Sequence, residues 1–101
     1  MLGTPKSAAH TIAHPHSAMA HCDLASALKA KGDLDGAIAE YRAALRLQPD
    51  NAAEHCDLGH LLWTKGDRKA AFEEFRKAHR LAPNDPTIRQ VYYNLMLLLE
   101  R

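Results

Sequence analysis

The side chains best suited to chemistry lie in the middle of the chain, where Cys56, Asp57 and His60 fall within five residues. On a helix, residues four apart share a face, so Cys56 and His60 can approach each other, and Asp57 lies near His60. An imidazole beside a thiol can activate it as a nucleophile, and the same three residue types bind metal ions. Thiol chemistry or metal binding at these residues is therefore one hypothesis.

Other features of the sequence argue against that hypothesis. The tetrapeptide His-Cys-Asp-Leu occurs at residues 21–24 and again at 55–58, but Ser26 stands in the first copy where His60 stands in the second. A catalytic thiol also needs groups that stabilise an oxyanion, and a zinc site needs about four ligands at regular spacing. Neither pattern is present. We therefore expect a chain that is not an enzyme and has no catalytic residues, metal or cofactor.

The repeated tetrapeptide belongs to a longer internal repeat of 34 residues. Such a period is the signature of repeat architectures and decides the fold before any single motif does. Further matches occur at the same displacement: residues 31–33 (Lys-Gly-Asp) with 65–67, residues 46–47 (Arg-Leu) with 80–81, and Pro49 with Pro83.

Each 34-residue unit is expected to form two antiparallel helices. Ser17 is a suitable N-cap for the first helix, and Gly32 can adopt the left-handed conformation that ends it. Asp33 then caps the second helix, and Pro49 ends it. The second unit repeats these signals with Gly66, Asp67 and Pro83, and Asp85-Pro86 begins a further helix.

The period and the residue pattern resemble the tetratricopeptide repeat family. Its small residue in the first helix corresponds to Ala25 and Gly59, and its aromatic residue in the second helix to Tyr41 and Phe75. The early aromatic position, usually tryptophan, holds histidine in both units. The resemblance implies an all-α solenoid of antiparallel helix pairs. The solenoid is expected to comprise repeats at 18–51 and 52–85 and a capping helix at 86–101. Together they form a domain over 17–101, which follows a mobile tail at 1–16.

The family resemblance also implies a function. Tetratricopeptide arrays are scaffolds whose concave side binds a peptide or helix of another protein. The corresponding places lack the cations that grip the carboxylate of heat-shock chaperones, so no such clamp is expected. We expect a protein partner in a groove lined by the following residues: Cys22, Asp23, Ser26, Lys29, Cys56, Asp57, His60, Trp63, Gln90 and Asn94.

The last helix is apolar over more than one stripe. Tyr93, Met96 and Leu97 extend its apolar surface, and a helix that is apolar nearly all round expects cover on both sides. We expect these three residues to mediate self-association, most simply as a two-fold dimer. Continuation of the native chain is the alternative, and the module could then serve as the attachment segment of a larger protein.

Composition excludes several other classes. The 101 residues carry a formal net charge of +1, which argues against a nucleic-acid module. Basic residues on the second helices are interleaved with glutamates, in pairs such as Glu73–Lys77. No apolar run approaches the ~20 residues that span a bilayer, and no secretion signal is evident, so we expect no membrane partner and a cytoplasmic location. Histidines at 10, 14 and 16 lack the regular spacing of a metal site.

Overall fold

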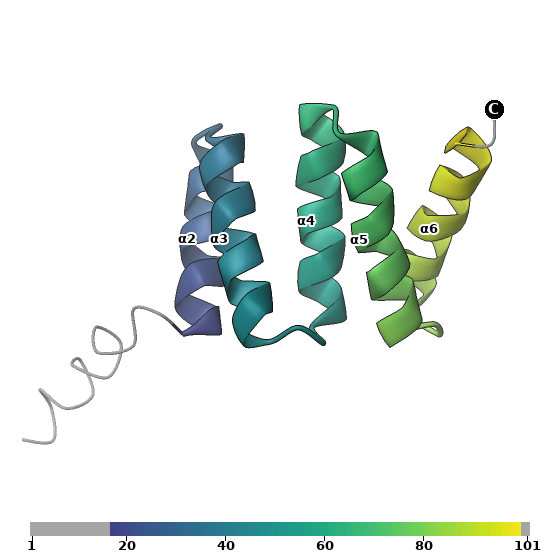
Figure 1. The fold of residues 1–101 in the computed structure, drawn as a ribbon, viewed down its shortest axis with the longest axis horizontal. Helices are drawn as coiled ribbons and strands as arrows, with labels where there is room; N and C mark the ends of the chain where they lie inside the picture. The colour runs from purple at the N-terminus through teal and green to yellow at the C-terminus, as the bar shows by residue number, and fades with distance from the viewer. Residues whose placement is uncertain (1–16, 100–101) are drawn as a thin grey trace, which may run out of the picture. The chain divides into compact units, whose positions relative to one another are not determined.

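A computed structural model describes residues 17–99 of the chain (Figure 1). This range contains five α-helices and no strand: α2 (Ala18–Ala30), α3 (Leu34–Leu47), α4 (Ala52–Lys65), α5 (Arg68–Leu81) and α6 (Pro86–Leu99). The predicted tail at 1–16 lies outside the described residues. Among the five helices, none is long and apolar enough to cross a membrane. The chain divides into two compact units, one ending at Leu47 and the other beginning at Gln48, and each is described by itself.

Unit 1 contains α2 and α3, which pack against each other as an antiparallel pair. The predicted signals for the helix ends are confirmed. The Ser17 hydroxyl accepts a hydrogen bond from the Ala20 amide at 3.1 Å, and the Asp33 carboxylate accepts one from the Gly36 amide at 2.9 Å. Between the helices Gly32 has a φ of 86°, a conformation that glycine adopts without a Cβ penalty.

The core of unit 1 comes mostly from α3. Its buried residues are Ala37, Ile38, Tyr41, Ala44 and Leu45, whereas α2 buries only Ala25. Helical spacing predicts an apolar stripe on the first helix from Ala20, Leu24, Ala27 and Leu28. Of these, Leu24 and Ala27 are exposed, Leu24 by 47%, and Ala20 and Leu28 are half-buried. The prediction is therefore wrong for Leu24 and Ala27: α3 covers the face of α2 that carries Ala25.

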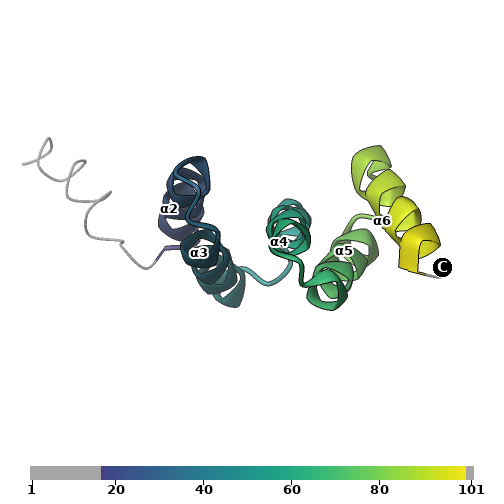
Figure 2. The same ribbon diagram turned by 90° about the horizontal axis from the view of Figure 1, so that it is seen from above.

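Unit 2 contains α4, α5 and α6, with α5 packed against both of the others (Figure 2). Its helix ends repeat those of unit 1. Asn51 accepts a hydrogen bond from the Glu54 amide at 3.1 Å, and Asp67 accepts one from the Ala70 amide at 3.1 Å. Gly66 has a φ of 101°. Asp85 caps α6 by accepting from the amides of residues 87 and 88, as Asp85-Pro86 predicts.

The core of unit 2 draws on all three helices. Buried residues come from the inner face of α4, from α5 and from two turns of α6: His55, Cys56, Leu58, Gly59, Leu61, Leu62, Ala71, Phe75, Ala78, Ile88 and Leu95. The stripe predicted for α4 is confirmed at Leu58, Leu61 and Leu62. A third helix therefore accompanies a larger core than the helix pair of unit 1 has.

A histidine–glutamate pair links the two helices of each repeat. Nδ1 of His21 lies 2.5 Å from Oε1 of Glu40, and Nδ1 of His55 lies 2.7 Å from Oε1 of Glu74. Nε2 of His55 also donates to the carbonyl of Pro49 at 2.7 Å. These pairs were not predicted, and they show how a polar ring can occupy the family's early aromatic position: its partner is a carboxylate from the second helix.

Candidate functional site

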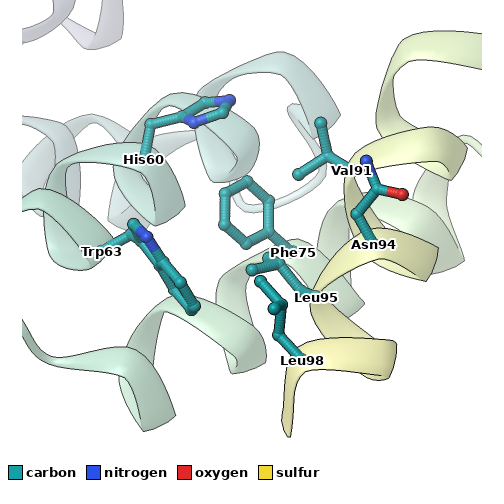
Figure 3. A pocket seen from close by; sticks show the side chains of 7 residues that line it. All are labelled: His60, Trp63, Phe75, Val91, Asn94, Leu95 and Leu98. Atoms are coloured by element: carbon teal, nitrogen blue, oxygen red, sulfur yellow. The ribbon is translucent and has the colours of Figure 1, made fainter.

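An apolar pocket lies in unit 2 between α4 and α6, with α5 beneath it (Figure 3). Its volume is about 200 Å³. The lining consists mainly of aromatic and aliphatic side chains, with one imidazole and one amide: His60, Trp63, Phe75, Val91, Asn94, Leu95 and Leu98. A pocket of this composition suits a bulky apolar side chain, with the polar groups available to orient the group that carries it.

The floor of the pocket is the ring of Phe75, which α5 contributes from below. The ring can lie there because residue 59 is glycine: a Cβ at that position would stand 2.9 Å from Cζ of Phe75. The ring is fully buried, and the His60 imidazole meets it edge-on with centroids 5.0 Å apart. The small residue that the repeat pattern requires at position 59 therefore shapes the site as well as the core.

The rim of the pocket carries its polar and charged groups. Trp63 is half-buried, and the guanidinium carbon of Arg68 lies 4.8 Å from the centroid of its ring, an arrangement that attracts a cation to the π face. On α6 the amide oxygen of Asn94 accepts a hydrogen bond from Nε2 of Gln90 at 2.9 Å. Both contacts hold rim side chains in defined orientations.

The structure brings three of the predicted groove residues together. His60, Trp63 and Asn94 line the pocket, and Gln90 supports it through Asn94. The predicted groove residues Cys22, Asp23, Ser26 and Lys29 lie on α2 of unit 1, where Cys22 is half-buried and the other three are exposed. In unit 2, Asp57 is half-buried on α4 one turn before His60.

Sequence reasoning missed four residues of the pocket: Phe75, Val91, Leu95 and Leu98. Periodicity assigned all four to packing between helices, and for Phe75 and Leu95 that is also correct, since both are buried. The signal that could have exposed the pocket is the pairing of a glycine at 59 with a phenylalanine at 75. Because residue 59 has no side chain, the Phe75 ring can pack against α4 and form the floor of the pocket.

Cys56 was predicted to face the groove, but it is buried in the structure. Burial raises the pKa of its thiol above the ordinary value, and the nearby carboxylates of Asp57 and Asp85 raise it further. The thiol is therefore protonated at neutral pH, which is the opposite of what an activated nucleophile requires. Burial also prevents a partner protein from contacting the thiol. Cys56 therefore belongs to the core of unit 2.

The three residues of the metal hypothesis, Cys56, Asp57 and His60, differ in their surroundings. Within residues 17–99, no three His, Cys, Asp or Glu side chains are arranged to hold a metal ion. The His60 ring instead packs against Phe75. The Cys56 thiol is buried in the core, the Asp57 side chain is half-buried, and the His60 ring meets Phe75 edge-on.

The residues predicted for self-association lie on α6. Tyr93 and Leu97, four residues apart, are exposed, and Met96 is half-buried. The Tyr93 ring stands at the edge of an aromatic group that also contains His79 and Tyr92, with centroids 5.7 and 5.8 Å away. Leu97 does not line the pocket, whereas its neighbour Leu98 does.

Two models of known protein families match the sequence. A model described as "TPR repeat" matches residues 25–66, and one described as "Tetratricopeptide repeat" matches residues 55–85. The chain is a tetratricopeptide repeat protein. Together the matches cover residues 25–85, and with the five described helices they confirm the predicted all-α helical-repeat fold.

Tetratricopeptide repeats generally mediate interactions between proteins and are generally non-catalytic scaffolds. That general role agrees with an open apolar pocket formed by the first helix of a repeat and the helix that follows the repeat. The comparison with curated proteins finds no match to the chain.

Proposed function

We propose that this tetratricopeptide repeat protein is a non-catalytic interaction module whose unit 2 binds a peptide or helix of a partner protein. One bulky apolar side chain of the partner enters the pocket between α4 and α6. The observation that carries the proposal is the pocket itself: an open apolar cavity of about 200 Å³ with Trp63, His60 and Asn94 at its rim.

Three properties of the pocket support this role. Its floor is fixed, because Phe75 is buried and packed against Gly59. Its walls offer apolar area from Val91 and Leu98, and burying one aliphatic or aromatic side chain against such walls is worth about 1.5–3 kcal/mol. Trp63 is the only tryptophan of the chain, and partly buried tryptophans are frequent anchors of binding energy.

Two adjacent leucines allow a sharp test. Leu98 lines the pocket, whereas Leu97 does not, and both side chains are more than half exposed, so a charge at either position is compatible with folding. Neighbouring residues on a helix point about 100° apart. Leu98→Glu therefore places a carboxylate at the pocket, and Leu97→Glu places the same charge on a different face of α6.

The experiment is selection of a phage-displayed random peptide library on the full chain, followed by titration of individual selected peptides. We expect the selected peptides to share a bulky apolar residue, to bind Leu97→Glu like the unaltered chain, and to bind Leu98→Glu at least tenfold more weakly. Selected peptides that bind both variants equally would contradict the proposal, as would a failure to enrich any sequence.

Self-association through α6 is a second candidate, favoured by the exposure of Tyr93 and Leu97 on one face of the helix. The same pair of variants tests it. Sedimentation at micromolar concentration should show dimers of the unaltered chain and of Leu98→Glu, and monomers of Leu97→Glu. A monomeric unaltered chain would refute this candidate and leave the pocket proposal unaffected.

A further inference from the structure

We propose that the pocket of unit 2 selects partner segments by charge as well as by shape: a segment whose apolar side chain is flanked by a basic residue on one side and an acidic residue on the other. This inference rests on the proposed function and adds the chemistry of the partner. It follows from the charges that stand at the two ends of the pocket.

One end of the pocket is acidic. Asp57 lies on α4 one turn before His60, and Asp85 lies at the start of α6, before Val91. Asp57 is in the second turn of α4 and Asp85 caps the start of α6, and both helices begin at the same end of unit 2 (Figure 1). The Asp85 carboxylate is held in place by the two amides that it caps.

The other end is basic. Trp63 is the pocket residue nearest the C-terminal end of α4, and the guanidinium of Arg68 stands over its ring. Arg68 is exposed at the first position of α5, so its charge faces both the ring and the solvent. A carboxylate on a ligand can approach this guanidinium while an adjacent apolar side chain lies in the pocket.

The two ends are correctly spaced for one short segment. Short turns connect α4 to α5 and α5 to α6, so α4 and α6 run in the same direction and begin at the same end of unit 2 (Figure 1). From Asp57 to Trp63 is six helical residues, a rise of about 9 Å. Four residue steps of an extended peptide span about 13 Å, enough to reach across that distance with one residue on either side of the apolar one pointing away. A basic side chain, an apolar side chain and an acidic side chain can thus engage both ends and the pocket together.

Four synthetic peptides test the inference, each with a central leucine and one charged or neutral residue two positions to either side: Lys/Glu, Lys/Lys, Glu/Glu and Gln/Gln. Binding is followed by the fluorescence of Trp63, which reports on the pocket because no other tryptophan is present. We expect Lys/Glu to bind the unaltered chain best, by about two- to fivefold over Gln/Gln, the range of exposed ion pairs. This advantage should shrink in high salt.

Variants that reverse or remove one charge sharpen the test. Arg68→Glu makes both ends acidic and suits the N-terminus of α5, so the variant folds and its preferred peptide becomes Lys/Lys. Asp85→Asn retains the cap of α6 but removes one acidic charge. It should therefore weaken the binding of the lysine-containing peptides only. Lys69→Glu, at the next exposed position of α5, is the matched control and leaves the peptide order unchanged.

The possible outcomes separate this inference from the proposed function. If all four peptides bind equally, or if Arg68→Glu retains the order seen for the unaltered chain, the charge preference is wrong and the pocket proposal stands. If no peptide, Gln/Gln included, changes the fluorescence of Trp63 or binds by calorimetry, the proposed function itself fails.

Discussion

The first helices of the two units share the tetrapeptide His-Cys-Asp-Leu but differ in how deeply they bury it. In α2 of unit 1, Leu24 is 47% exposed and His21 is half-buried. In α4 of unit 2, Leu58 is 1% exposed and His55 is buried. The same four residues therefore specify a helix in both places but not how deeply the rest of the fold buries it.

Replacing the leucine of each tetrapeptide should give the largest difference in stability between the two units. Leu58→Ala removes a fully buried side chain and leaves a cavity, so we expect a loss of about 2–5 kcal/mol in the free energy of unfolding. Leu24→Ala, at the same repeat position in unit 1, should cost less than about 1 kcal/mol because the side chain is already in water. Urea denaturation of both variants measures the two losses, and equal losses would contradict the difference in burial.

Breaking the histidine–glutamate pair should also destabilise unit 2 more than unit 1, but by a smaller margin. His55→Ala removes a partner of the largely buried Glu74 carboxylate and the donor to the Pro49 carbonyl, at an expected cost of about 1–3 kcal/mol. His21→Ala breaks a pair whose side chains are 18% and 25% exposed, so water can replace the lost partner and the expected cost is below about 1 kcal/mol. Denaturation again measures both, and a larger loss for His21→Ala would overturn the comparison.

The two cysteines should differ in reactivity with an alkylating reagent. In a Cys22→Ser variant, the remaining Cys56 should react slowly, with a midpoint of the rate–pH profile above that of a free cysteine, because its pKa is raised. The sign carries over to stability. The unfolded chain loses the Cys56 proton at a lower pH than the folded chain, so the free energy of unfolding falls once the pH exceeds the ordinary thiol pKa. Cys56→Ala should abolish that alkaline loss, and its persistence would assign the loss to another group.

The smallest effect is expected at the start of α3. Gly36 lies where unit 2 has Ala70, and both amides donate to the capping aspartate of their helix. The nearest atoms to a Cβ at Gly36 belong to the Asp33 carboxylate, which would have to rotate slightly, and Ala70 shows that the equivalent cap accommodates a methyl group. Gly36→Ala should therefore stabilise the chain by about 0.5–1 kcal/mol, the gain in helix propensity. A decrease in the melting temperature would show that the two caps differ.

Much of the fold could be predicted from spacing alone. The 34-residue displacement located the helix ends at Asp33 and Asp67, the left-handed glycines and the family, because caps and turns depend on single residues in sequence. Depth of burial could not be predicted at Leu24, since periodicity assigns a residue to a face but does not say what covers that face. The expected Glu73–Lys77 pair is also replaced: Glu73 pairs with Arg76 at 2.8 Å.

The site was predicted less completely than the fold. His60, Trp63 and Asn94 could be assigned to a binding surface because family positions mark them as outward-facing. Val91 and Leu98 could not, since an aliphatic residue on a helical stripe has the same pattern whether it packs or lines a pocket. His55 carried no signal of its own, because its partners Glu74 and Pro49 are distant in sequence and meet it only in the folded unit.

The contact between Gly59 and Phe75 has a consequence for how this module can change its preference for ligands. The floor of the pocket comes from the Phe75 ring of α5, and the position of that ring depends on the missing side chain of Gly59 on α4. Exchanges at these two interior positions would deepen or fill the cavity while every outward-facing residue stayed the same. Two such proteins with identical surfaces could then accept side chains of different size.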